Sequence, residues 1–170
     1  MNEPYGKQLN HSDHKPTEKK NPVVLLLDNI KDPKNVGSMF RIADAMGVQK
    51  VYLTGNAPTP PNKNINKTSR STEKSVDFEY QLDALDVISQ LKSDCFSIIS
   101  LEVTSSSIDL ADVACDSYDR VCIVVGAESE GVSDSILRAS DLHVHIPMYG
   151  QNSSMNVAVA CGIALYTFLP

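Results

Sequence analysis

The distribution of apolar and polar positions predicts a chain in which strands and helices alternate. Continuous apolar runs at residues 23–28, 96–101 and 121–126 are typical of strands that are covered on both faces. Shorter apolar runs at residues 50–53 and 142–146 predict two more strands. Apolar residues with helical spacing predict helices between and after them, at residues 35–47, 82–91, 133–139 and 156–169.

This order predicts an α/β domain with a mostly parallel sheet and helices on both of its faces. The domain is expected to span residues 21–170, preceded by a flexible polar arm at residues 1–20. Residues 54–75 hold three prolines and few large apolar residues, which predicts a long loop. Asn35 is the expected N-cap of the first helix, and Gly47 is the expected stop after it.

Composition supports one domain with a buried core. The chain has 170 residues, of which 42% are hydrophobic and 21% are charged. No apolar run reaches the roughly 18 residues that a membrane span needs. The N-terminal segment also lacks the apolar stretch of a secretory signal. A cytoplasmic protein is therefore expected.

Cysteine and histidine give no clear metal site. The four cysteines form no CxxC pair, and Cys122 and Cys161 lie inside apolar runs, which favours buried free thiols. His143 and His145 alternate in one predicted strand and so share a face. Two histidines alone favour a structural or solvent-facing role over metal binding.

Charge is distributed unevenly along the chain. The formal net charge is -6, but residues 1–74 hold 12 Lys/Arg against 7 Asp/Glu, and residues 75–170 hold 3 against 14. Binding of a polyanion depends on the local field rather than on the total charge. Composition alone leaves open whether the basic residues bind nucleic acid or only solubilise the chain. The basic residues concerned are Lys31, Lys34, Arg41, Lys63, Lys67, Arg70 and Lys74.

Ligands of parallel α/β sheets bind beyond the carboxyl ends of the strands. The segment 126–131 follows a strand and has two glycines, which allow a ligand to approach the backbone. It is not a Walker A loop, and the GxGxxG fingerprint is absent from the chain. The small polar residues Ser153, Ser154 and Asn156 fit either a helix cap or a polar ligand. Arg41 follows Asn35 by six residues, so both could border one cleft, and the alternative for Arg41 is a solvated charge on an amphipathic helix.

Three of these segments together resemble the SpoU/TrmH family, within the SPOUT class of RNA 2′-O-ribose methyltransferases. The first motif is LDNIKDPKNVGSMFRIADAMGVQKVYLTG, which contains Asn35 and Arg41. The second is VVGAESEGVS, which contains Glu128, and the third is IPMYGQNSSMNVAVACGIALY, which contains Ser154 and Asn156. The match covers roughly residues 22–169.

The resemblance implies a trefoil knot, made from the segments that carry the second and third motifs. It also implies an S-adenosylmethionine site at the knot and a homodimer formed through the C-terminal helix. The implied catalytic residues are Arg41, Asn35, Glu128, Ser154 and Asn156. The implied cofactor-binding residues are Leu101, Gly126, Ile146, Ser154 and Met155. The implied RNA-binding residues are Lys31, Lys34, Arg41, Lys63, Lys67 and Arg70.

The expected activity is methyl transfer from S-adenosylmethionine to a ribose 2′-hydroxyl, with tRNA as the first choice of substrate and rRNA as the alternative. A knotted RNA-binding protein without activity is a second hypothesis, and a nucleotide-binding α/β protein is a third. The chain departs from the family at two positions. Met155 replaces the usual leucine, and Ser71 stands where similar small members often have glycine.

Overall fold

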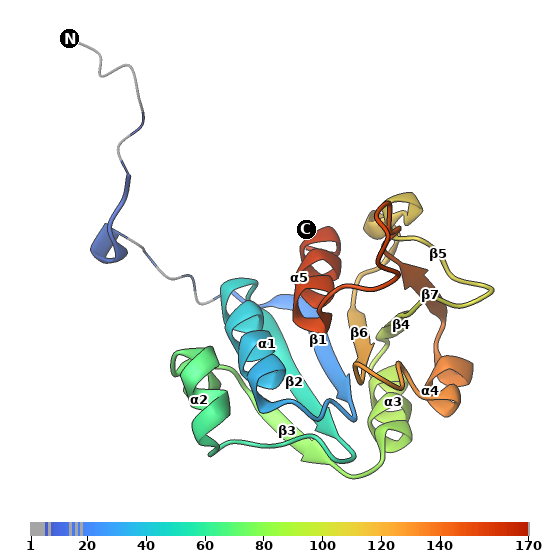
Figure 1. Cartoon of the computed structure of the whole chain (residues 1–170), viewed down its shortest axis with the longest axis horizontal. Helices are drawn as coiled ribbons and strands as arrows, with labels where there is room; N and C mark the ends of the chain where they lie inside the picture. The colour runs from blue at the N-terminus through green and yellow to red at the C-terminus, as the bar shows by residue number, and fades with distance from the viewer. Residues whose placement is uncertain (1–5, 7, 14, 16, 18, 170) are drawn as a thin grey trace.

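The computed structural model describes residues 6, 8–13, 15, 17 and 19–169. Its centre is a seven-stranded sheet with all neighbouring strands parallel, in the order β3-β2-β1-β6-β4-β7-β5 (Figure 1). The predicted α/β fold is therefore confirmed. The strands are β1 Asn21–Asp28, β2 Val48–Thr54, β3 Phe78–Gln81, β4 Ser97–Leu101, β5 Ile108–Asp109, β6 Val121–Gly126 and β7 Leu142–His145. The α-helices are α1 Pro33–Ala45, α2 Lys63–Ser69, α3 Ala84–Ser93, α4 Asp134–Ala139 and α5 Val157–Thr167.

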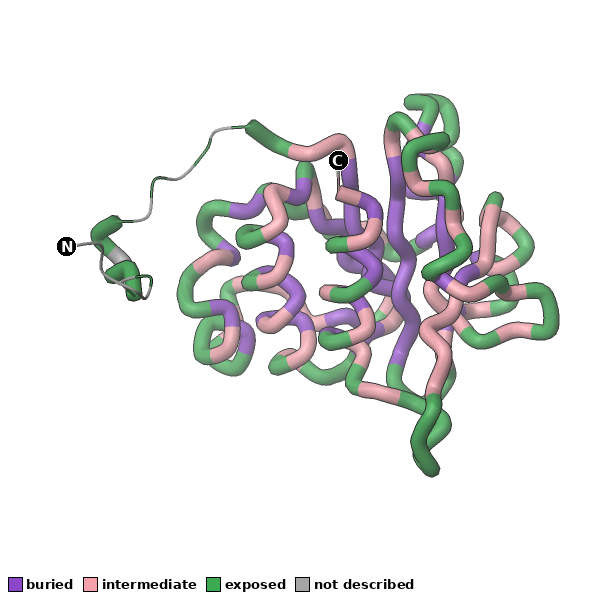
Figure 2. The backbone as a smooth tube through the Cα atoms, turned by 90° about the horizontal axis from the view of Figure 1, so that it is seen from above, coloured by how far each residue is buried: buried purple, intermediate pink, exposed green. Residues whose placement is uncertain are grey.

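The central strand β1 is buried on both faces because helices cover both sides of the sheet. Leu25 and Leu27 belong to one apolar cluster, which includes residues of α1 and α5. Leu26, between them, belongs to a second cluster with residues of α3 and α4. β1 and β6 have the longest runs of buried residues among the strands, and Figure 2 shows long buried stretches of backbone in the middle of the molecule. The uninterrupted apolar run that predicted β1 thus reflects two cores, one on each face.

The first helix begins before the predicted position. Its N-cap is Asp32, whose Oδ1 accepts a hydrogen bond from the backbone N of Lys34 at 2.8 Å. Pro33 occupies the first helical turn, where its missing N–H is not needed. The prediction of Asn35 as the cap is wrong, and this leaves the Asn35 side chain available for other contacts. Gly47, with φ of +62°, follows the helix end as predicted.

Residues 54–75 are not a continuous loop. They contain α2 and a 3-10 helix at Thr72–Lys74. The α2 helix carries only one large buried apolar residue, Ile65, so its amphipathic signal in the sequence is weak. It packs so closely on α1 that a Cβ at Gly37 would lie 2.5 Å from the carbonyl oxygen of Ile65.

Two strands are absent from the sequence prediction. β3 exposes Phe78 and Tyr80, so it lacks a buried apolar run. β5 has only two residues and forms through its pairing with β7. The remaining 3-10 helices are His11–Asp13, Leu110–Asp112 and Cys115–Ser117.

The predicted arm at residues 1–20 falls partly outside the described residues, and the knot stays a prediction. Among the described residues, none of the helices is both long enough and apolar enough to cross a membrane.

The backbone conformation of Cys95, after the end of α3, indicates a substitution that should stabilise the fold. Exposed Cys95 has φ of +63°, and the next residue, Phe96, donates its backbone N–H to the carbonyl oxygen of Leu91 at 2.9 Å. This left-handed position favours glycine. We expect Cys95→Gly to raise the free energy of unfolding by about 1 kcal/mol in urea titrations. Cys95→Ser is the control, because it removes the thiol and keeps the backbone penalty; equal midpoints for the two variants would contradict the argument.

Candidate functional site

A cavity of about 550 Å³ lies beyond the carboxyl ends of β4, β6 and β7. This is the edge of a parallel sheet where ligands are expected. All five predicted cofactor-binding residues line it, although they come from widely separated parts of the chain. They are Leu101, Gly126, Ile146, Ser154 and Met155.

The turn after β6 forms one wall of the cavity. A Cβ at Gly126 would lie 2.0 Å from the backbone carbon of Gly131, so no side chain fits at this position. The close approach that the sequence assigned to a ligand is made here by the chain itself. Glu102 fixes the same turn, because its Oε2 accepts a hydrogen bond from the backbone N of Val132 at 2.9 Å.

The cavity lining combines acidic and apolar residues. No lysine or arginine lines it within the described part of the chain. Lys31 pairs with one of the acidic residues, Glu130, at 2.6 Å, so it neutralises the lip of the cavity. This lining favours a ligand with apolar surface and positive charge. The acidic residues are Glu102, Glu128, Glu130 and Asp134.

Hydrogen bonds between three side chains link the first, second and third motif segments. Asn156 caps α5, and its Oδ1 accepts hydrogen bonds from the backbone N atoms of Ala158 at 3.0 Å and Val159 at 3.3 Å. Its Nδ2 is therefore the group that donates to Asn35 Oδ1, at 3.1 Å. Asn35 Nδ2 in turn donates to Glu128 Oε1. Bonding to the α5 backbone thus sets the orientation of both amides.

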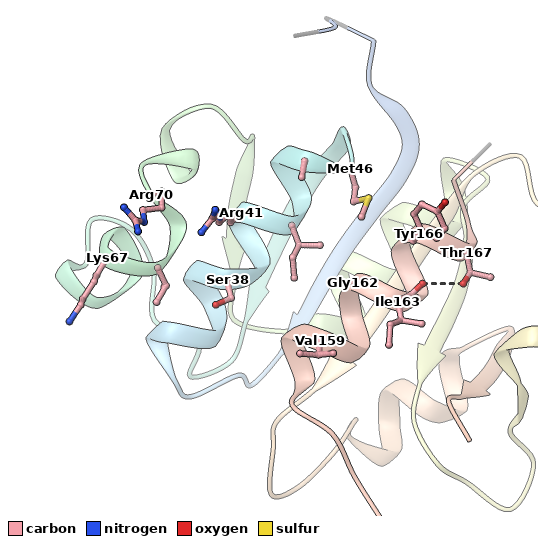
Figure 3. Close-up of a pocket in the computed structure, with 13 residues that line it drawn as sticks. Ser38, Arg41, Met46, Lys67, Arg70, Val159, Gly162, Ile163, Tyr166 and Thr167 are labelled. Atoms are coloured by element: carbon pink, nitrogen blue, oxygen red, sulfur yellow. Dashed lines mark hydrogen bonds between the residues drawn. The ribbon is translucent and has the colours of Figure 1, made fainter. Parts of the chain in front are cut away.

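Arg41 does not join this network. It lines a separate groove of about 850 Å³ between α1, the end of α2 and α5. The hypothesis that Asn35 and Arg41 border one cleft is therefore not supported within this chain, since Asn35 does not line this groove. Figure 3 shows Arg41, Lys67 and Arg70 on one side of the groove and the α5 side chains on the other.

The α5 side of the groove is an exposed apolar stripe. Val159, Ile163 and Tyr166 are 55%, 40% and 73% exposed, and their spacing of four and three places them on one helix face. An exposed apolar stripe beside cationic residues is typical of an interaction surface.

The predicted RNA-binding residues other than Lys31 lie on α1, α2 and the residue after α2, and all are exposed. Lys63 and Lys67 are four residues apart on α2, so they share one face of that helix. Arg70 lies after the end of the helix and lines the groove together with Lys67. Arg70 and Ser71 have φ of +57° and +74°, a backbone region that favours glycine, which is the residue that the family resemblance implies at position 71.

Buried Glu73 holds this segment in place. It accepts hydrogen bonds from Asn66 Nδ2, at 2.8 Å, and from Ser69 Oγ. Burial raises the pKa of Glu73, but these two hydrogen bonds, a backbone hydrogen bond and the charge of Lys74 together hold the pKa below its ordinary value.

The remaining candidate groups have structural contacts. Cys122 and Cys161 are free and buried as predicted, and burial raises the pKa of Cys161 to about 12. His143 and His145 each contact a serine of the segment after β4. Among the described residues, no cluster of three or more His, Cys, Asp or Glu could hold a metal ion.

Sequence reasoning placed Glu102 in a strand-end segment without assigning it a role, and it missed His145 as a cavity residue. Each stands at the end of a strand, Glu102 directly after β4 and His145 as the last residue of β7. Their position at strand ends was the signal that could have identified them as cavity residues.

Comparison with known proteins identifies relatives over the whole of the sheet. Residues 22–166 match the model of the SpoU rRNA methylase family. A relative from Staphylococcus epidermidis, named "Putative TrmH family tRNA/rRNA methyltransferase", is 31% identical over 143 residues, which are 84% of this chain and 56% of that protein. The chain therefore spans about half the length of the curated relatives it matches.

Solved structures share the fold. The A. aeolicus TrmH/SpoU tRNA modifying enzyme superposes with a TM-score of 0.79 at 28% identity, over 89% of this chain and 75% of that chain. The AdoMet-bound rRNA methyltransferase from Sinorhizobium meliloti has a TM-score of 0.80 at 24% identity, over 92% and 58% of the two chains. A structure described as giving insights into 2-OH methylation of C/U34 on tRNA has a TM-score of 0.75 at 21% identity, over 87% and 95%.

Proposed function

The chain belongs to the SpoU rRNA methylase family, and we propose that it transfers a methyl group from S-adenosylmethionine to a ribose 2′-hydroxyl of tRNA. The observation that carries this proposal is the meeting of all five predicted cofactor residues at one cavity, next to the Asn35–Glu128–Asn156 network. The tRNA substrate is supported by the relative from A. aeolicus, which is described as a tRNA modifying enzyme.

The cavity fits this cofactor by size and by lining. A volume of about 550 Å³ lies within the range of small-molecule sites, roughly 300–1,000 Å³. Leu101, Ile146 and Met155 provide apolar surface for a ring system, and the acidic residues suit a positively charged sulfur. When bound, S-adenosylmethionine supplies an already activated methyl group. The protein's contribution is therefore mainly alignment of the acceptor hydroxyl.

The roles of the remaining residues follow from their chemistry. Asn35, Glu128 and Asn156 form a pre-oriented polar edge that positions the ribose, and Ser154 adds a hydroxyl at the cavity. Arg41 anchors a neighbouring phosphate through its forked guanidinium. It does not act as a base, because an arginine side chain stays protonated in proteins.

Isotope transfer from methyl-labelled S-adenosylmethionine to purified tRNA and rRNA tests the proposal. We expect label in tRNA, recovered after nuclease digestion as a 2′-O-methyl nucleoside. Label in rRNA alone would show that rRNA, and not tRNA, is the substrate. A base-methylated nucleoside would contradict the ribose 2′-hydroxyl as the target. RNA binding with no transfer to either RNA would favour a catalytically inactive RNA-binding protein.

We further propose a homodimer formed through α5, because Val159, Ile163 and Tyr166 leave a continuous apolar stripe exposed. Light scattering at micromolar concentration is expected to give twice the mass of the chain. Ile163→Glu places a charge in the stripe and is expected to give a monomer. Leu82→Glu is the matched control, because Leu82 is 75% exposed and lies outside the groove. A monomeric wild-type protein would contradict the interface.

A further inference from the structure

Two histidines on β7 are held by different hydrogen bonds. His143 Nε2 lies 2.8 Å from the carbonyl oxygen of Leu137, which can only accept, so this nitrogen carries a proton. His143 Nδ1 lies 3.2 Å from Ser106 Oγ. Both ring nitrogens of His143 are thus used within the fold, and the residue does not line the cavity.

His145 has the opposite arrangement. Its Nδ1 lies 3.0 Å from Ser107 Oγ. The single proton of the Ser107 hydroxyl goes to the carbonyl oxygen of Thr104, at 3.0 Å, so Ser107 must accept from His145 Nδ1–H. In the neutral ring, Nε2 then carries a lone pair. Nε2 has no hydrogen-bond partner in the described part of the chain, and His145 lines the cavity.

The serine that His145 holds is hydrogen-bonded to Thr104, a residue of a second wall of the cavity. Thr104 lines the cavity, and its backbone N donates to Ser107 Oγ at 3.0 Å. The bond from His145 therefore ties the turn at residues 104–107 to the end of β7. His145 thus fixes this wall through Nδ1, and its Nε2 makes no hydrogen bond within the described residues.

The surroundings define the group that this acceptor would bind. Leu101 and Ile146, beside the end of β7, are apolar and line the same cavity. A neutral N–H or O–H donor on a ring system fits there, and the adenosine half of S-adenosylmethionine carries such donors.

Resting on the proposed function, we propose that His145 is a cofactor-binding residue of this site. Its Nδ1–H positions the turn at residues 104–107, and its Nε2 accepts a hydrogen bond from the adenosine half of S-adenosylmethionine.

Two conservative variants separate these roles. The amide of His145→Asn replaces the Nδ1–H donor and leaves no group at the position of Nε2. The longer His145→Gln places its amide near Nε2 and loses the bond to Ser107. His143→Asn is the matched control, because it changes a histidine on the same strand outside the cavity. Calorimetry with S-adenosylmethionine measures affinity, and amide hydrogen exchange reports on residues 104–107.

We expect affinity to fall roughly tenfold in His145→Asn, with unchanged exchange in the turn. His145→Gln is expected to stay within about threefold of the wild-type affinity and to exchange faster at residues 104–107. Wild-type affinity in His145→Asn, or a greater loss in His145→Gln than in His145→Asn, would overturn the acceptor role. Failure of the wild-type chain to bind S-adenosylmethionine would instead overturn the proposed function.

Discussion

Arg41→Ala is expected to lower the single-turnover rate of methyl transfer by about 100-fold or more at saturating RNA. Arg41 lies in the groove beside α5, outside the cofactor cavity, so its loss should act on RNA alignment. Misplacement of a reacting group by about 1 Å is enough for a rate loss of this size. Affinity for S-adenosylmethionine, measured by calorimetry, should stay within about threefold of wild type, because Arg41 is not among the cavity residues.

Arg41→Lys distinguishes a forked contact from a simple charge requirement. An ammonium group cannot make two parallel hydrogen bonds to a phosphate, so rescue should be poor. Because Arg41 borders the proposed dimer interface, light scattering must show that both variants keep the wild-type mass. Near-normal single-turnover rates for Arg41→Ala would remove its proposed role. Full activity of Arg41→Lys would leave only a charge requirement.

The parts of the fold that the sequence predicts well are those whose burial is continuous or regularly periodic. Leu25, Leu26 and Leu27 all face a core, and no solvent-facing pattern competes with the strand interpretation. The edge strand β3 is different, because exposed Phe78 and Tyr80 give it no such run. Its place is set by pairing with β2, which is a tertiary effect.

Local chemistry also explains the error at the first helix. Asp32 and Asn35 are both good N-cap residues, and Pro33 between them favours the earlier start. With α1 starting at Pro33, Asn35 lies inside the helix, and its side chain reaches Glu128, 93 residues away in sequence. Neither helix spacing nor composition predicts the contact between Asn35 and Glu128.

The sequence predicted which strand ends form the site, but it did not predict which side chains contact one another there. Parallel strands bring their carboxyl ends to one edge, so the segments that follow the strands, such as residues 126–131, were expected to border a ligand. That Leu101, Gly126 and Ile146 belong to one cofactor site was implied by the family resemblance. The separation of Arg41 from Asn35 was not predicted, because helix spacing gives an angle on one helix and says nothing of the α5 helix that packs beside it. The contact of Ser107 with His145 likewise depends on β5 pairing with β7.

Asn35→Asp is expected to reduce the rate of methyl transfer by roughly 100-fold at neutral pH. The substitution replaces the N–H group that Asn35 donates to Glu128 with a carboxylate oxygen, which can only accept. Asn156 still donates to position 35, but a carboxylate there has no proton for Glu128 Oε1. Two carboxylates in contact cannot both stay ionised at low cost, so the pKa of one must rise. The rate of Asn35→Asp should therefore recover partly as the pH falls and the pair takes up a shared proton.

The double variant Asn35→Asp/Glu128→Gln tests whether this hydrogen bond is the cause. The glutamine amide donates to the new carboxylate, while Asn156 Nδ2 donates to it as it does to Asn35 in the wild type. Single-turnover rates should place the double variant at the level of Glu128→Gln alone, well above Asn35→Asp. Such non-additivity is the signature of two residues in direct contact. A double variant as slow as Asn35→Asp, with a wild-type melting temperature, would show that the amide of Asn35 has a role that does not pass through Glu128.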